Sequence, residues 1–238
     1  MSIIKLENIT FTYNDKEILK DFSLNIESNK ISCLLGSSGC GKTTILRLIA
    51  GLETPRFGKI IIDNQEVSNT NEILIAAHKR EIGYVFQDLA LWPHFTVFKN
   101  VAFGLSQHHK TDIESSVNEI LKYFNLHEHA NKYPHQLSGG QQQLLAIARS
   151  LVLRPKILLM DEPLANLDVK IKRKMLSYIK DIKKQFNISI VYVTHDHKEA
   201  FSISDNIIVL NNGNIEDVGS VEDIKCSDNE YIKYFLEY

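Results

Sequence analysis

The sequence lacks long apolar runs, an excess of charge of one sign, and a segment typical of export. No apolar run approaches the ~20 residues that a helix needs to cross a bilayer. The chain does not open with a charged segment followed by an apolar one, as a signal peptide would. The net charge is −2 at pH 7, which gives no support for a nucleic-acid surface. We therefore expect any role at a membrane to be exerted from outside the bilayer, through a partner.

Cysteine is also scarce, since the sequence contains only Cys33, Cys40 and Cys226. They lie far apart without the spacing of metal ligands, and two of them fall in a predicted buried strand and a tight loop, which favours a reducing compartment. The composition, 44% hydrophobic and 24% charged, is that of an ordinary globular protein. A length of 238 residues suits one large domain, or one core with a sizeable insertion.

One glycine-rich loop organises the chain, because it stands between a predicted strand and a predicted helix. The apolar run Ile31–Leu35 precedes it and the amphipathic segment Thr44–Leu52 follows it, which is the context that a G-x-x-x-x-G-K-[ST] pattern requires. Its small residues let the backbone turn N–H groups onto phosphate oxygens, and the helix start adds a partial positive charge. The loop consists of Gly36, Ser37, Ser38, Gly39, Cys40, Gly41, Lys42, Thr43 and Thr44. We interpret it as a nucleotide site, in which Lys42 reaches the terminal phosphates and Thr43 offers its hydroxyl to Mg²⁺.

Acidic residues end another apolar run, the predicted strand that begins at Ile157. Asp161 and Glu162 stand at its tip, where acids are costly unless they are paired or bind a metal. Because the chain also has a phosphate loop, we expect Asp161 to hold Mg²⁺ and Glu162 to orient and deprotonate the attacking water. A solvated pair of acids is the weaker interpretation.

Gln87 and His195 follow the strands predicted at 82–86 and 188–193, and open α/β sheets place polar ligands at such ends. Gln87 is a candidate for holding Mg²⁺ or the attacking water, although a lone glutamine after a strand is usually a loop residue. His195 is a candidate contact to the γ-phosphate through its ring N–H. A polar residue that caps the next helix is an equally good interpretation of His195.

Two further segments carry alternatives of their own. Tyr13 ends the first predicted strand at a turn and is either a platform for adenine or, as the residue alone favours, a hydrophobic anchor of the turn. Leu137–Gln141 leads into a helix, in which Ser138 is a good N-cap. Gly139 and Gly140 leave the helix start open to an anion. Taken alone, this segment is better explained as a capped helix with a flexible lead-in.

Periodicity divides the chain into parts of different character. Residues 3–35 hold two alternating runs, typical of an antiparallel sheet with one wet face, and then one fully apolar strand. Residues 63–79 are polar and irregular, with a short helix expected near 72–77. Residues 88–153 are helical, and the α/β pattern resumes after them. The helices predicted in this part are Val97–Leu105, Ile113–Phe124 and Gln141–Leu153.

Taken in order, these segments resemble the ATP-binding subunit of an ATP-binding cassette (ABC) transporter, over essentially the whole chain. LSGGQ followed by L-L-M-D-E-P is close to diagnostic of that family. The motifs in register are Tyr13 as the adenine-stacking aromatic, Gly36–Thr44 as Walker A, Gln87 as the Q-loop, Leu137–Gln141 as the signature, Ile157–Glu162 as Walker B with its glutamate, and His195 as the switch histidine.

The resemblance implies an α/β fold, a P-loop NTPase (RecA-like) core with an antiparallel β subdomain and an inserted α-helical subdomain. The ATP-binding core would comprise residues 1–87 and 154–238, and the helical signature subdomain residues 88–153. We expect no C-terminal regulatory domain, which several related importers have. The implied cofactors are ATP and Mg²⁺. Catalysis is assigned to Glu162, His195, Gln87 and Lys42, and metal binding to Thr43, Gln87 and Asp161.

The resemblance also implies partners. Two chains, as a homodimer or as paired ATPase subunits, would close head to tail on ATP, each Walker A facing the other chain's Ser138–Gln141, with Asn166 and Asp168 at the interface. Asp88–Leu105 looks like the importer type, in which this region receives the transmembrane permease subunit. The chain would then power an importer from the cytoplasmic face of the membrane, as a peripheral protein. It would meet a substrate-binding protein only indirectly and would bind no nucleic acid.

The sequence leaves other kinds of ABC ATPase open, and it departs from the family pattern at two positions. An exporter ATPase is the runner-up, and a non-transport ABC ATPase acting on DNA is disfavoured because the chain has neither heptads nor room for a coiled-coil insertion. Ala165 stands where the family usually has serine, and Leu144 where it commonly has arginine. The histidines His108, His109, His127, His129 and His135 lie on polar segments that we expect to be exposed, with no acid or cysteine to complete a ligand set. Mg²⁺ on the nucleotide is therefore the metal that we expect.

Overall fold

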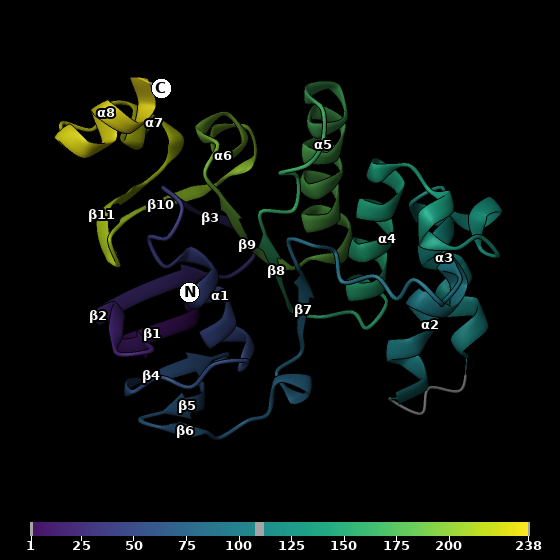
Figure 1. Cartoon of the computed structure of the whole chain (residues 1–238), viewed down its shortest axis with the longest axis horizontal. Helices are drawn as coiled ribbons and strands as arrows, with labels where there is room; N and C mark the ends of the chain where they lie inside the picture. Colours follow the sequence, from purple (N-terminus) through teal and green to yellow (C-terminus); the bar gives the residue numbers. More distant parts are fainter. Residues whose placement is uncertain (1, 108–111, 238) are drawn as a thin grey trace.

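Two β-sheets with helices around them make up the part of the chain that the computed structural model describes, residues 2–107 and 112–237 (Figure 1). The first sheet contains, in spatial order, β2 (Lys16–Glu27), β1 (Ser2–Tyr13), β4 (Phe57–Ile62), β5 (Gln65–Asn69) and β6 (Glu72–Ile73). The second contains β11 (Asn214–Gly219), β10 (Asn206–Asn211), β3 (Ile31–Gly36), β9 (Ser189–Thr194), β8 (Ile157–Asp161) and β7 (Ile82–Val85). The α/β class predicted from the sequence is confirmed.

Tight turns join β1 to β2 and β4 to β5 in the first sheet, whose strand pairs are all antiparallel. β1 and β2 are joined at Asn14 and Asp15, which both have positive φ, and β4 and β5 at Asp63 and Asn64, which also do. Two consecutive residues with positive φ form the hairpin turn whose twist suits antiparallel strands, and Asn and Asp tolerate that conformation. The turn at Asp63 and Asn64 explains why the polar residues after β4 form a strand, β5, that pairs with it.

The second sheet is parallel from β10 to β7, and only β11 runs antiparallel to its neighbour. Its inner strands β3, β8 and β9 are buried at every position, as expected of parallel strands with both faces covered. Alternate side chains belong to different cores, since Leu34 packs into one hydrophobic cluster and its neighbours Cys33 and Leu35 into the other.

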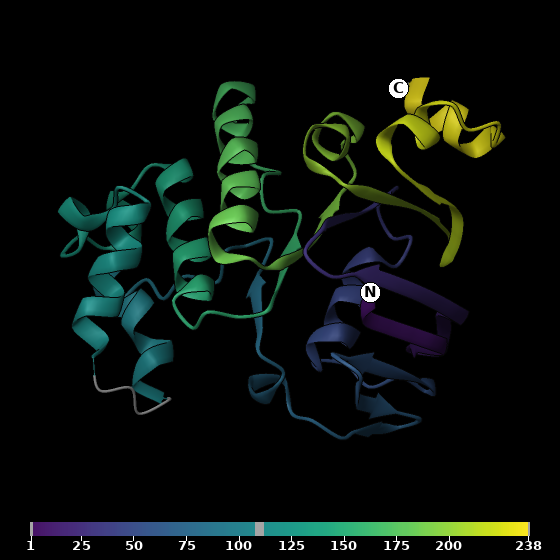
Figure 2. The same cartoon turned by 180° about the vertical axis from the view of Figure 1, so that it is seen from behind.

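Helices cover the two faces of the parallel sheet. α1 lies between the two sheets, where its apolar side chains join one core with those of β1, β2 and β4. The apolar side chains of α4, α5 and α6 belong to the core on the opposite face. α2 and α3 lie at the end of the molecule away from the first sheet in both views (Figures 1 and 2). The helices are α1 (Lys42–Ala50), α2 (Val97–Gln107), α3 (Ile113–Tyr123), α4 (Gly139–Leu151), α5 (Val169–Phe186), α6 (His197–Ile203), α7 (Val221–Lys225) and α8 (Glu230–Glu237).

The helices predicted between 88 and 153 correspond to α2, α3 and α4, with ends displaced by one or two residues. The prediction for residues 63–79 was wrong. They form β5, β6 and the 3₁₀ turn η1 (Ala77–Lys79) instead of a helix near 72–77. The hairpin turn at Asp63 and Asn64 brings this segment onto the edge of β4, so pairing replaces local helical preference. Within the described residues, no helix has the length and apolar character needed to span a bilayer.

Arg80 joins the end of α1 to β5 of the first sheet. Its side chain is buried, and the guanidinium donates hydrogen bonds to the carbonyl oxygens of Leu48 and Ile49 at the last turn of α1. It also donates to the carbonyl oxygen of Val67 and the hydroxyl of Ser68 on β5. Burial lowers the pKa of Arg80 to about 10, so the group stays charged at neutral pH. A cation at this position satisfies the unpaired carbonyls of a helix end and complements its dipole.

Replacing Arg80 by alanine should lower the free energy of unfolding by about 3 kcal/mol or more, because several buried acceptors lose their donors together. Equilibrium urea unfolding followed by circular dichroism measures the change. Arg173→Ala, at an exposed position of α5, is the matched control and should stay within about 0.5 kcal/mol of wild type. Equal stability of the two variants would show that Arg80 contributes no more than a surface arginine.

Candidate nucleotide-binding site

Four adjacent strands of the parallel sheet end at the same edge, and each is followed by a residue predicted to act on a nucleotide. β3 leads into the glycine loop, β9 is followed by His195, β8 ends in Asp161 and is followed by Glu162, and β7 leads to Gln87. Because β3, β9, β8 and β7 are consecutive neighbours, the four positions lie side by side. Carboxyl ends of parallel strands are where open α/β sheets bind their ligands.

The glycine loop turns sharply at two glycines with positive φ, Gly39 at +82° and Gly41 at +104°. Gly41 occupies the N-cap of α1 without a side-chain cap, so the first N–H groups of the helix have no side-chain acceptor there. A Cβ added at Gly39 would meet no atom within 4 Å, which shows that the space over the loop is open. A cavity of about 370 Å³ lies over it, lined by Ile18, Ser38, Gly39, Gly41, Lys42, Thr43, Thr44, Gln87 and Glu162.

Lys42 is buried beneath the loop that it belongs to, with only 4% of its surface exposed. Its ammonium donates hydrogen bonds to the carbonyl oxygens of Gly36 at 2.8 Å and Ser37 at 2.7 Å, and it lies 3.8 Å from the Cys40 thiol. The contact of Lys42 with terminal phosphates stays a prediction, although the residue does line the cavity. Its position places one positive charge directly under the turn.

The Thr43 hydroxyl and the Asp161 carboxylate meet across the gap between α1 and β8. Thr43 Oγ1 donates to Asp161 Oδ1 at 3.0 Å, and the hydroxyl of Tyr84 donates to Asp161 Oδ2 at 3.3 Å. Burial raises the pKa of Asp161, while these two hydrogen bonds oppose the increase. Tyr84 was missed by the sequence analysis, which considered only Gln87, the residue that follows the strand predicted at 82–86. The hydroxyl in such a strand was the available signal, since a buried tyrosine usually finds a partner for its O–H.

Glu162 and His195 form a direct contact on the rim of the cavity. His195 Nδ1 lies 3.0 Å from Glu162 Oε2, with the histidine side chain 54% and the glutamate side chain 16% exposed. A carboxylate accepts, so Nδ1 carries the hydrogen in this contact and Nε2 is left for another partner. Glu162 has a φ of +42°, a conformation that is uncommon outside glycine and that occurs at functional turns. Gln87 is exposed and also lines the cavity.

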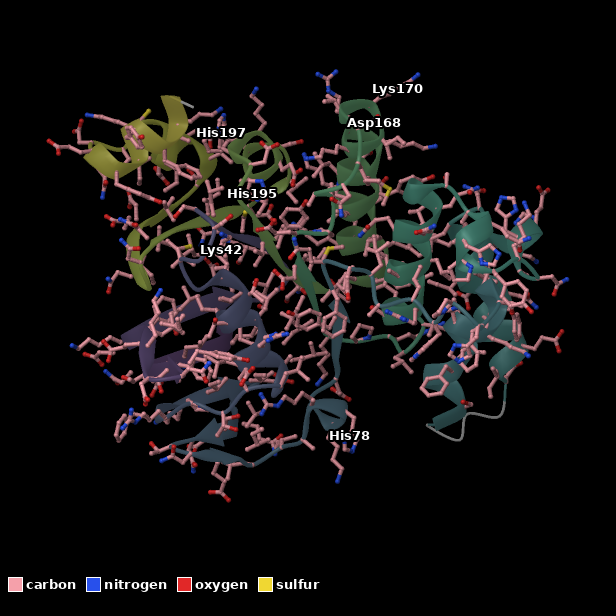
Figure 3. All side chains as sticks on the ribbon, viewed as in Figure 1. Lys42, His78, Asp168, Lys170, His195 and His197 are labelled. Carbon is pink, nitrogen blue, oxygen red and sulfur yellow. The ribbon has the colours of Figure 1, made fainter. Side chains whose placement is uncertain are left out.

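Other predicted residues lie outside this cavity. Ser138 caps α4, accepting from the backbone N–H of Gln141, whose side chain in turn accepts from the backbone N–H of Ser138. Gly139 and Gly140 adjoin the start of α5. Asp168 caps α5 by accepting from Ile171 N at 2.9 Å. Figure 3 shows Asp168 at the beginning of α5, well separated from Lys42, while His195 lies much nearer to Lys42 in that view.

Tyr13 is half exposed on the first sheet. Its ring meets Phe11 edge to face at 5.7 Å, and its hydroxyl donates to Glu53 at 3.3 Å. Neither contact distinguishes the adenine platform from the turn anchor, so the role of Tyr13 stays a prediction.

One expectation about the histidines was wrong. His129 is half-buried, and its Nε2 lies 2.9 Å from the side-chain nitrogen of Gln141 at the start of α4, because the turn at 127–129 folds back against that helix. His127 and His135 are exposed as predicted, and His108 and His109 lie outside the described residues. Among residues 2–107 and 112–237, no group of three or more His, Cys, Asp or Glu side chains could hold a metal ion by itself.

The residues at the strand ends fit the two predicted cofactors. Hydroxyl and carboxylate oxygens, as on Thr43 and Asp161 3.0 Å apart, are the donors that Mg²⁺ takes together with phosphate oxygens. The open turn at Gly39 and Gly41, with Lys42 below it, suits a polyphosphate.

Comparison with known proteins supports the same conclusion. A protein-family model described as ABC transporter matches residues 19–165. The chain belongs to the ABC transporter family. This match confirms the resemblance inferred from the motifs, and it confirms ATP as the expected cofactor.

Two curated relatives and one solved structure place the chain within the ABC family. The chain is 44% identical over 237 residues to a spermidine/putrescine import ATP-binding protein, PotA, from Hahella chejuensis, covering 98% of this chain and 64% of the relative. It is 42% identical over 240 residues to a sulfate/thiosulfate import ATP-binding protein, CysA, from Neisseria meningitidis, covering 98% of this chain and 66% of the relative. The chain thus spans slightly less than two thirds of the length of these relatives.

The structural comparison confirms the fold predicted for an ABC ATPase. The structure of cbiO1 from Clostridium perfringens, described as part of the ABC transporter complex cbiONQ, superposes with a TM-score of 0.85 at 29% identity. The superposition covers 99% of this chain and 95% of that one. The two sheets and the helices around them are therefore those of the P-loop NTPase fold of this family.

The cysteines Cys33, Cys40 and Cys226 should differ strongly in reactivity. Burial raises the pKa of Cys33 to about 12 and also raises the pKa of Cys40, so at pH 8 little of either thiol is the reactive thiolate. Cys226 is exposed. Brief alkylation with iodoacetamide at pH 8, followed by peptide mass spectrometry, should label Cys226 first and Cys33 only after unfolding. Labelling of Cys33 as fast as that of Cys226 would contradict the closed sheet around β3.

Proposed function

We propose that this chain is the ATP-binding and ATP-hydrolysing subunit of an ABC importer. The observation that carries the proposal is the contact between Glu162 and His195 at 3.0 Å on the rim of the cavity over the glycine loop. An ATP-binding module needs only the loop, whereas a hydrolase also needs a base held near the terminal phosphate. Here the base and the residue that orients it are in contact.

The proposed roles follow from where the side chains lie. The loop from Gly36 to Thr44 holds the phosphates through its N–H groups, with Lys42 supplying a charge. Thr43 and Asp161 would hold Mg²⁺, and Gln87 lines the same cavity as these two residues. The bound metal would supply neutralisation of the phosphate charge. Glu162 takes a proton from the attacking water at its carboxylate, and His195 keeps that carboxylate oriented through Nδ1.

We further propose that two copies of the chain close head to tail on ATP. The N-termini of α1 and α4 are both suited to bind an anion. Of these two helices, only α1 borders the cavity over the glycine loop. The start of α4 adjoins Leu167 and Ile171 beside Asp168. Ser138–Gln141 of one copy would therefore complete the phosphate site of the other, with Asp168 at the interface.

An importer is favoured over an exporter by the relatives, whose names describe import ATP-binding proteins. Their cargoes differ, so the cargo of this chain is left open. We propose that residues 88–153 form the helical part that receives a permease subunit at the cytoplasmic face of the membrane. Trp92 lies half-buried there, packed against Phe95 and Phe103 and under the Arg149 guanidinium, and Phe103 is 38% exposed.

Glu162→Gln should slow ATP hydrolysis about 10²–10⁴-fold while ATP still binds, because only the proton acceptor is lost. Phosphate release and ATP affinity are measured on the same preparation. Glu119→Gln, which changes an exposed glutamate on α3, is the matched control and should hydrolyse ATP at the wild-type rate. Undiminished turnover by Glu162→Gln would remove Glu162 from the role of base.

Two inactive variants should restore activity when mixed if the site is shared. Lys42→Ala damages the glycine loop. Ser138→Asp keeps a good N-cap for α4 but places a negative charge where the partner's phosphate would lie. A mixed dimer then has one pocket with both changes and one with neither. We expect the equimolar mixture to hydrolyse ATP faster than the sum of the separate variants. A mixture that stays at that sum would indicate that each chain completes its own site.

A further inference from the structure

The hydroxyl of Tyr84 reaches the Asp161 carboxylate from the neighbouring strand. Strands β7 and β8 are parallel, and Tyr84 is paired with Leu159. Side chains two residues apart on a strand share a face, so Asp161 lies on the same face as Leu159, next along β8. The register therefore directs Tyr84 toward Asp161, and its hydroxyl donates to Oδ2 at 3.3 Å.

The two oxygens of Asp161 are held separately and from different elements. Thr43, at the start of α1, donates to Oδ1, and Tyr84, on β7, donates to Oδ2. One hydrogen bond would leave the carboxylate free to rotate about its last side-chain bond, whereas two donors on opposite oxygens define its plane. Tyr84 thus supplies the second restraint on the group proposed to hold Mg²⁺.

Tyr84 is itself held in place. Its ring stacks on that of Phe86 with centroids 4.2 Å apart and planes at 25°, and its carbonyl oxygen accepts a hydrogen bond from the Ser150 hydroxyl on α4 at 2.9 Å. Its side chain also lines a second cavity, of about 460 Å³, together with Thr43, Gln87 and Asp161. To orient a carboxylate that binds a metal, a hydrogen-bond donor must itself be fixed and must lie beside the metal-binding residues.

We propose that Tyr84 is a positioning residue for Mg²⁺ binding, which sets the orientation of the Asp161 carboxylate by hydrogen bonding to Oδ2. The proposal rests on the function proposed above, since it assigns Asp161 to the metal. Tyr84 touches neither nucleotide nor metal in this role. Loss of the Tyr84 hydroxyl should therefore raise the Mg²⁺ concentration that ATP binding requires. It should leave the affinity for ATP in the absence of metal unchanged.

The test uses the full chain with Glu162→Gln as the parent, so that no turnover disturbs binding. A fluorescent ATP analogue is titrated at a series of Mg²⁺ concentrations and again in EDTA. Mg²⁺ should enhance binding of the analogue by the parent. Adding Tyr84→Phe should raise the Mg²⁺ concentration that gives half of this enhancement about 10-fold, the usual effect of losing a partner of a metal ligand. The affinity in EDTA and the melting temperature should not change.

Tyr123→Phe on the same parent is the matched control, because it removes a hydroxyl from a half-buried tyrosine on α3. It should leave the Mg²⁺ requirement as in the parent. An unchanged Mg²⁺ requirement for Tyr84→Phe, or an equal loss of affinity in EDTA, would overturn the positioning role while leaving the proposed function intact. A parent that binds no ATP under either condition would instead overturn the proposed function, and the role of Tyr84 with it.

Discussion

The register of the parallel strands is the constraint on which the site depends. Leu35 pairs with Thr194 across β3 and β9, and Asp161 pairs with Val193 across β8 and β9. The residues that follow these strands therefore emerge at the same level, although they lie far apart in the sequence. A shift of one residue in any pairing would turn side chains to the opposite face of the sheet. Burial on both faces prevents such a shift, because each strand has alternate side chains packed into different cores.

Local signals were sufficient to predict the glycine loop and the strand ends. A glycine pattern between a strand and a helix has one structural solution, and Asp161 and Glu162 after an apolar run have few alternatives to a functional role. The helical stretch and the strands around it followed from periodicity, since 3.6-residue and two-residue repeats are properties of the chain itself, and the resemblance to a known family supplied the α/β fold.

What could not be predicted depends on contacts between distant segments. The donor role of Tyr84, for example, depends on the pairing of β7 with β8. The strands β5 and β6 form because a turn places a polar segment against β4, so the sheet rather than the segment decides their conformation. His129 was expected at the surface because it lies among polar residues, and nothing in the local sequence indicates its contact with Gln141.

The buried guanidinium of Arg80 has a consequence for how the sequence can vary. Gly51 follows α1 with a φ of +75°, and a Cβ at that position would lie 2.5 Å from the carbon at the centre of the Arg80 guanidinium. The arginine can occupy its place only while position 51 has no side chain. Glycine at position 51 is thus required for two separate reasons, the space that the guanidinium occupies and a backbone conformation that other residues rarely adopt. A lineage that replaces the arginine would remove the first requirement and still keep the second.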